Sequence, residues 1–181
     1  MEEQELIKKV QAGSKNSFRK LIDRYGERLM CDAYKFMKNT QDAEDLYQDT
    51  FIKVYENIGS FKFKSQFYTW VYRIMANLAF NKFRKRKKMQ FVDDQDDYLW
   101  NTLPADHHNE PENSLPKEKL KEKVDGALDN LSPKQKTVFI MKHYEGKKIK
   151  DIAAILGCHN GTVKKYLYRA TRKLRASIST I

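Results

Sequence analysis

The 181-residue sequence is poor in cysteine, proline and glycine, with two, four and seven of them. Cys31 and Cys158 are too few for a disulfide framework and lack the spacing of metal ligands, so they indicate a reducing compartment and no metal site. Scarce glycine and proline, with charged residues at 33% of the chain, favour a soluble helical protein.

Long apolar runs and enzyme signatures are also missing. No stretch of about 18 apolar residues occurs, so no membrane span is predicted. The segment Met1–Glu5 is acidic and lacks the apolar core of a signal peptide, which predicts a cytoplasmic chain. We find no P-loop, no paired metal-binding carboxylates and no nucleophile beside a base. The sequence therefore predicts a protein that is not an enzyme and needs no cofactor.

Positive charge is abundant, with a net charge of +11. Such a chain is attracted to nucleic acid or to an anionic membrane surface. The net charge is +8 over residues 1–90, −7 over residues 91–116 and +10 over residues 117–181. This partition predicts two basic modules joined by an acidic connector. The membrane alternative is less favoured, because no predicted helix has a wide exposed apolar face.

Apolar residues recur at helical spacing in the first module. We expect a short helix that ends near Gly13, a second helix capped by Ser14, a third over about residues 42–58 and a fourth over about residues 66–88. These segments predict a four-helix domain over residues 1–90.

The rest of the chain predicts a linker and a second helical domain. Residues 91–116 contain three prolines and little periodicity, which indicates an extended acidic linker. Ser132-Pro133-Lys134-Gln135 has the pattern of a capping box that begins a helix. The predicted fold is all-α, with the second domain over residues 117–181.

Residues 149–174 have the pattern of a helix-turn-helix. The two inner faces consist of Ile149, Ile152, Ala153 and Leu156, then Val163, Leu167, Ala170 and Leu174. Gly157 between them suits the left-handed conformation that ends a helix. The outer face of the second helix carries hydrogen-bond donors suited to the DNA major groove. An ordinary helical hairpin with a solvated basic face is the alternative.

The predicted third helix has two unlike faces. Its core stripe consists of Ala43, Leu46, Tyr47, Thr50, Phe51, Val54 and Ile58. The other face is acidic around one apolar residue and consists of Asp45, Gln48, Asp49, Ile52 and Glu56. In a basic protein this face suits a protein partner with exposed Arg or Lys, although a solvated face is the alternative.

Eight aromatic residues lie between Phe61 and Phe83, interleaved with cations and followed by the basic run Arg84–Lys88. Aromatic rings stack on unpaired bases and cations follow the backbone, so the pattern favours single-stranded DNA. A solvated helix end is the alternative for the basic run. The expected buried residues are Phe67, Trp70, Val71, Ile74 and Leu78, whereas Phe61 and Phe63 are expected to be functional.

Three motifs in this order resemble the extracytoplasmic-function (group IV) sigma factors of bacterial RNA polymerase. Residues 42–55 are similar to their polymerase-binding helix in region two. Residues 67–77, followed by Arg84-Lys85, are similar to their promoter-melting segment. Residues 131–135 and the helix-turn-helix are similar to their region four. The resemblance covers about residues 8–174.

The resemblance implies a sigma factor that binds core RNA polymerase and directs promoter recognition, DNA melting and transcription initiation. It implies polymerase binding by Asp45, Gln48, Asp49 and Ile52. It implies minus-ten DNA binding by Phe61, Lys62, Phe63, Ser65, Asn77, Asn81, Arg84, Lys85 and Lys88, with the two asparagines reading a flipped base. It implies minus-thirty-five DNA binding by Gly161, Thr162, Lys164, Lys165, Tyr168, Arg169 and Arg172. Lys164 and Lys165 replace the Arg and Ser common in relatives, which leaves the minus-thirty-five sequence open.

The implied partners are core polymerase, promoter DNA and an anti-sigma factor or other regulatory protein. The linker is expected to follow the basic RNA-exit path of the polymerase through Asp93, Asp94, Asp96, Asp97 and Asp106. The alternative function is a stand-alone helix-turn-helix regulator, which gives no reason for the aromatic segment or the acidic helix face. The sequence does not identify the promoter, the regulon, the inducing signal or the regulatory partner.

Overall fold

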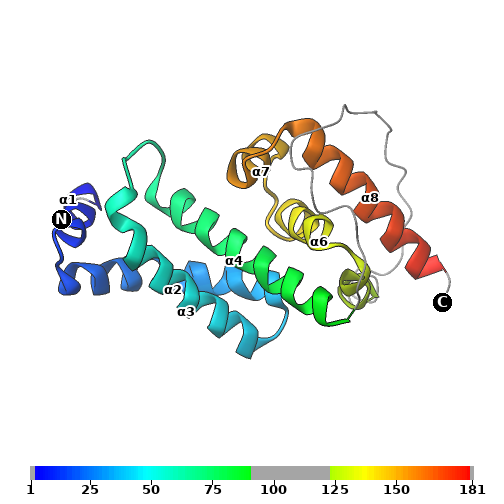
Figure 1. Cartoon of the computed structure of the whole chain (residues 1–181), viewed down its shortest axis with the longest axis horizontal. Coiled ribbons are helices and arrows are strands. Elements are labelled where there is room, and N and C mark those ends of the chain that lie inside the picture. Colours follow the sequence, from blue (N-terminus) through cyan, green and yellow to red (C-terminus); the bar gives the residue numbers. More distant parts are fainter. Residues whose placement is uncertain (1–2, 91–122, 180–181) are drawn as a thin grey trace. The chain divides into compact units, whose positions relative to one another are not determined.

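The computed structural model describes residues 3–90 and 123–179, and within these ranges all regular structure is helical (Figure 1). The predicted all-α fold is confirmed. The linker at 91–116, with its five aspartates, lies outside the described residues. The chain forms two compact units, Met1–Ala79 and Phe80–Ile181, so the division falls inside one helix. The sequence-based boundary after residue 90 stays a prediction.

The first unit contains α1 (Glu3–Gln11), α2 (Lys15–Met37), α3 (Thr40–Asn57), the 3-10 turn η1 (Ile58–Ser60) and the start of α4 (Phe67–Gln90). Ser14 caps α2 as predicted, because its side chain accepts a hydrogen bond from the backbone N–H of Ser17. Asn39 caps α3, where its Oδ1 accepts from the N–H of Asp42 at 2.8 Å. This cap begins α3 at Thr40, slightly before the predicted start.

The inner face of α3 agrees with the sequence pattern, since all predicted stripe residues are buried except the half-buried Tyr47. The inner face of α4 differs from the prediction, because Ile74 and Leu78 are only half-buried. The buried α4 side chains are Phe67, Tyr68, Val71, Tyr72, Met75, Ala76, Ala79 and Phe83. The helix is rotated by about one residue from the expected register, with large aromatic rings and small alanines on the same buried face. Trp70, expected to be a buried anchor, is half-buried.

A buried polar contact joins α2 to the first turn of α4. The Tyr68 hydroxyl donates a hydrogen bond to Asp32, whose other carboxylate oxygen accepts from Lys35 Nζ at 2.8 Å. The Arg28 guanidinium lies 3.8 Å from the centre of the Tyr68 ring. A buried carboxylate is stable only when its hydrogen-bond partners are present. The contact therefore fixes where α4 begins relative to α2.

Replacing Tyr68 with phenylalanine is expected to lower the free energy of unfolding by about 1–3 kcal/mol, because Asp32 loses a buried donor while the ring remains. Chemical denaturation measures the change. Tyr34→Phe is the matched control, because Tyr34 is 49% exposed on α2. Equal stability of both variants would show that the Tyr68 hydroxyl does not hold the two helices together.

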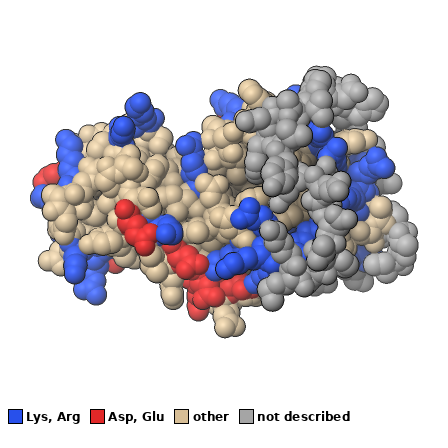
Figure 2. Space-filling view, in the orientation of Figure 1, with Lys and Arg blue, Asp and Glu red and all other residues tan. Residues whose placement is uncertain are grey.

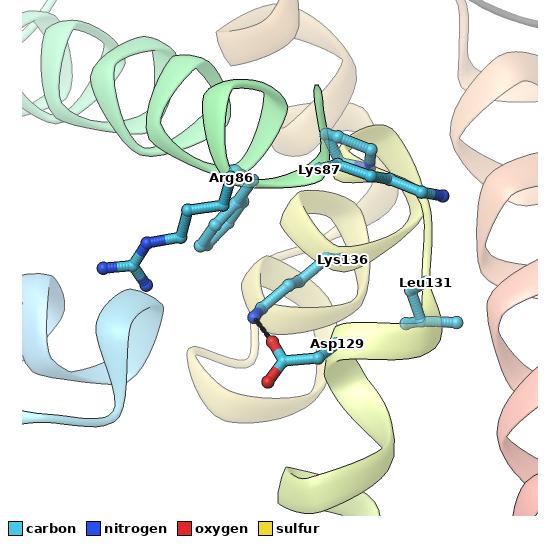
Figure 3. Close-up of a pocket in the computed structure, with 7 residues that line it drawn as sticks. Arg86, Lys87, Asp129, Leu131 and Lys136 are labelled. Carbon is cyan, nitrogen blue, oxygen red and sulfur yellow. Dashed lines mark hydrogen bonds and ion pairs between the residues drawn. The ribbon is translucent and has the colours of Figure 1, made fainter. Parts of the chain in front are cut away.

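The second unit begins with helical residues 123–127 and the 3-10 turn η3 (Leu128–Asn130), followed by α6 (Pro133–Phe139) and the π-helical turn η4 (Ile140–Tyr144). The predicted capping box is present at Ser132, with hydrogen bonds of 3.1 and 3.3 Å between Ser132 and Gln135 in both directions. Lys136 Nζ lies 2.5 Å from Asp129 Oδ1 and ties α6 to η3 (Figure 3).

The helix-turn-helix consists of α7 (Ile149–Leu156) and α8 (Asn160–Ser179). Gly157 ends α7 with φ +65° and ψ 37°, the left-handed conformation predicted for it. The buried side chains are Ile152, Ala153 and Ile155 on α7 and Val163, Tyr166, Ala170 and Leu174 on α8. Ile149, Leu156 and Leu167, also predicted on the inner faces, are half-buried. Ile155 and Tyr166 were missed by the prediction, the latter because tyrosine also suits an exposed face.

Candidate protein and nucleic-acid interfaces

The outer face of α3 is acidic around an exposed apolar residue. Asp45 and Gln48 are exposed, Asp49 is half-buried, and Ile52 is 56% exposed. Figure 2 shows acidic side chains gathered over α3. Tyr55, which the sequence did not indicate, extends the apolar part with 41% exposure and packs on the Phe18 ring with centroids 4.9 Å apart. An exposed isoleucine beside carboxylates suits a surface that is both apolar and basic.

Glu56 contributes less to this face than the sequence suggested. Its Oε2 lies 2.6 Å from Lys53 Nζ, so a neighbouring cation compensates its charge. The carboxylate of Glu56 is therefore partly neutralised before any partner binds.

The loop between η1 and α4 has a buried base and an exposed tip. Phe61 is 5% exposed, and its ring centroid lies 5.3–5.4 Å from those of Phe67 and Trp70. The expectation that Phe61 offers its ring to a ligand is corrected, because the ring is packed in the aromatic core. Phe63 is 37% exposed and its ring packs at a tilt of 56° against that of Phe61, with centroids 5.0 Å apart.

The tip of this loop is polar and cationic. Lys62, Lys64, Ser65 and Gln66 are exposed around Phe63. Lys64 was not among the predicted DNA-binding residues, although the alternation of lysine and phenylalanine in Phe61-Lys-Phe-Lys64 was a sufficient signal. An exposed ring between cations is the arrangement that stacks on an unpaired base and contacts its phosphates.

One face of α4 continues with exposed polar and basic residues. Asn77 and Asn81 are exposed and, being four residues apart, lie on the same helix face. Arg84 and Lys85 are exposed further along α4. The side chain of Lys88 lies outside the described part of the chain. Amide side chains read base edges and guanidinium and ammonium groups bind phosphates, so the arrangement is suited to DNA.

The outer face of α8 is basic around an exposed aromatic ring. Tyr168 is 57% exposed, Lys164 and Arg172 are exposed, and Lys165 and Arg169 are half-buried. Gly161 and Thr162 lie half-buried in the first turn, where the N–H of Thr162 donates to the carbonyl oxygen of His159 at 3.0 Å. Without a side chain at Gly161, this turn can approach a DNA backbone closely.

The two cysteines differ in environment. Cys31 is exposed on α2, whereas burial raises the pKa of the half-buried Cys158 thiol beside Gly157. In residues 3–90 and 123–179 no group of three or more His, Cys, Asp or Glu side chains could hold a metal ion. Over the same ranges no helix combines the length and apolar character needed to cross a bilayer.

Comparison with known proteins identifies the family. The family Sigma-70 region 2 matches residues 21–89, and Sigma-70, region 4 matches residues 121–174. The ECF RNA polymerase sigma-E factor of Haemophilus influenzae is 31% identical over 184 residues, which cover 99% of this chain and 96% of the relative. The chain belongs to the ECF RNA polymerase sigma factors. The sigma factor SigW of Bacillus subtilis is 29% identical to it over 95% of this chain and 94% of the relative.

Solved structures have the same fold. The sigma factor RpoE of Bartonella quintana, in complex with the anti-sigma factor NepR, matches 90% of this sigma factor and 96% of its own chain, with a TM-score of 0.56 and 27% identity. CnrH, in complex with the cytosolic domain of CnrY, matches 97% and 96% with a TM-score of 0.60 and 22% identity, which supports the fold alone. The function of the chain is therefore that of a sigma factor, a transcription-initiation factor that directs RNA polymerase to promoters.

Proposed function

We propose that the outer face of α3 binds core RNA polymerase through Asp45, Gln48, Asp49 and Ile52. The observation that supports this most directly is the 56% exposure of Ile52 among carboxylates. An apolar side chain in an acidic surround offers a desolvated contact at the centre and charge pairing at the rim. This is a protein-binding surface, whereas both faces proposed for DNA are cationic.

The loop at residues 61–66 and the outer face of α4 bind the melted minus-ten element. Phe63 supplies the stacking surface and Lys62, Ser65, Arg84, Lys85 and Lys88 contact the backbone. Asn77 and Asn81 read the edge of a flipped base, whose unstacking costs a few kcal/mol that stacking must offset. Phe61 supports this surface from beneath, as its burial requires.

The outer face of α8 binds the minus-thirty-five element in the major groove. Lys164, Lys165, Tyr168, Arg169 and Arg172 reach bases and phosphates, while Gly161 and Thr162 bring the first turn close to the backbone. We place the chain in the cytoplasm as a protein with no enzymatic activity of its own. An anti-sigma factor or similar protein is the proposed regulator, as in the solved complex of RpoE with NepR.

Transcription in vitro tests the proposed function. The chain is combined with bacterial core polymerase on a library of genomic fragments, and the 5′ ends of the transcripts are sequenced. Discrete start sites that require both components are expected. Tight binding of a selected promoter in a gel-shift assay without core polymerase would instead favour the stand-alone helix-turn-helix regulator.

A further inference from the structure

Gln11, the last residue of α1, donates two hydrogen bonds to a segment far away in the sequence. Its Nε2 lies 2.9 Å from the carbonyl oxygen of Ile58 and 3.0 Å from that of Phe61. Ile58 is the first residue of η1, and Phe61 is the residue directly after the end of η1. A single amide therefore bridges the two ends of the turn from which the loop at residues 61–66 departs.

The helix that carries Gln11 is firmly attached to the first unit. Leu6, Ile7 and Val10 are 1–3% exposed, and near the start of α1 the Tyr25 hydroxyl of α2 donates to the Glu3 carboxylate. Burial, followed by this hydrogen bond, raises the pKa of Tyr25 to about 12, which keeps the hydroxyl protonated as a donor. Figure 1 shows α1 beside the turn between α3 and α4. Gln11 is therefore carried by a helix whose position is fixed by packing and by a hydrogen bond at its other end.

The other end of the loop is held independently. Phe67 and Tyr68 pack on the Tyr25 ring with centroids 5.7 and 5.9 Å apart, and Tyr68 donates to the buried Asp32. Between the two attachments the exposed residue Phe63 has φ +55°, a left-handed conformation that is unfavourable for a bulky side chain. Such a conformation persists only where the surrounding structure imposes it, and it is concentrated at ligand-binding sites.

We propose that Gln11 is a positioning residue for minus-ten recognition. By fixing the carbonyls of Ile58 and Phe61, it sets the direction in which the loop leaves η1 and holds Phe63 where it meets an unpaired base. Gln11 itself contacts no DNA in this scheme. The proposal rests on the proposed role of the loop, and it extends the recognition apparatus to α1, which precedes the residues matched by Sigma-70 region 2.

The test compares Gln11→Met, which keeps the length of the side chain and removes its donors, with Gln4→Met. Gln4 is an exposed glutamine on the same helix, so the control makes the same change away from the loop. Gln11→Glu, in which a carboxylate faces the two carbonyls, is the second variant. Each variant is assembled with core polymerase and a promoter selected from the genomic library, with its minus-ten strand left unpaired.

A set of strands is prepared, each with one abasic position in the minus-ten element. For each position, the measured quantity is the affinity for the native strand divided by the affinity for the abasic strand. We expect Gln11→Met and Gln11→Glu to lower the largest of these ratios about tenfold, in keeping with the loss of two hydrogen bonds. Gln4→Met should leave it unchanged. Affinity for core polymerase should match that of the unmodified protein, since the α3 surface is intact. The melting temperature should fall only by the small amount that the loss of two part-buried hydrogen bonds implies, and all affinities are measured well below it. In the free protein, amide hydrogen exchange over residues 60–66 should become faster in the two Gln11 variants only.

The outcomes separate the two proposals. If the unmodified holoenzyme shows no base preference on the unpaired strand, the proposed function of the loop fails together with the positioning role. If the unmodified holoenzyme prefers the native strand over an abasic strand and the Gln11 variants show the same preference, the positioning role alone is overturned. A loss of core affinity or melting temperature that accounts for the whole effect also overturns it, because Gln11 would then stabilise the fold only.

Discussion

Replacing Asp45 with arginine is expected to lower the affinity of the chain for core RNA polymerase by about 100-fold. Asp45 is exposed on the outer face of α3, one turn before Asp49 and two turns before Ile52. Charge reversal at a protein interface removes an attraction and leaves two like charges together, which costs about 2–5 kcal/mol when the pair is desolvated. Titration of labelled core polymerase with each variant measures the change.

Glu27→Arg is the control for this prediction. Glu27 is an exposed acid on α2, so the control makes the same change in net charge away from the α3 surface. Circular dichroism should show equal helix content in both variants. Equal affinities for core polymerase would exclude the outer face of α3 as the binding surface. Its acidic residues would then form only a solvent-exposed helix face.

Replacing Lys165 with glutamate is expected to weaken binding of holoenzyme to a duplex minus-thirty-five element by about 100-fold. Lys165 lies on the outer face of α8 in the turn that follows Gly161, on the same side as Tyr168. A contact to a base edge is worth about 1–3 kcal/mol, and reversal of the charge adds repulsion from phosphates. Binding is measured by fluorescence anisotropy over a series of salt concentrations.

Lys173→Glu is the matched control on the same helix. Lys173 is exposed and lies about two turns further along α8, beyond the first turns that carry Lys165 and Tyr168. Both variants change the net charge equally, so a long-range electrostatic effect would weaken binding equally in both. That result would contradict a groove-reading role for Lys165. Tight duplex binding without core polymerase would contradict the proposed function more broadly.

Local sequence patterns predicted most of the helices and both of the surfaces that we propose for DNA binding. Capping residues act within one turn, so Ser14 and the capping box at Ser132 could be identified directly from the sequence. Gly157 was predicted for a similar reason, because its left-handed conformation is a local property. The acidic face of α3 follows from helical periodicity alone. The polymerase and DNA roles of these surfaces came from the family resemblance and stay predictions for the individual residues.

The sequence by itself determined that this protein is helical, basic in two blocks and a member of its family, because composition, periodicity and motif order are properties of the chain. Only the tertiary structure decided that Phe61 is buried beneath the loop and that α4 presents Tyr72 and the alanines to the core. The hydrogen bonds of Gln11 to the carbonyls of Ile58 and Phe61, and of Tyr68 to Asp32, could also be found only in the tertiary structure. Each joins residues 36 to 50 positions apart, and no local pattern specifies which distant backbone or carboxylate a side chain meets when the helices pack.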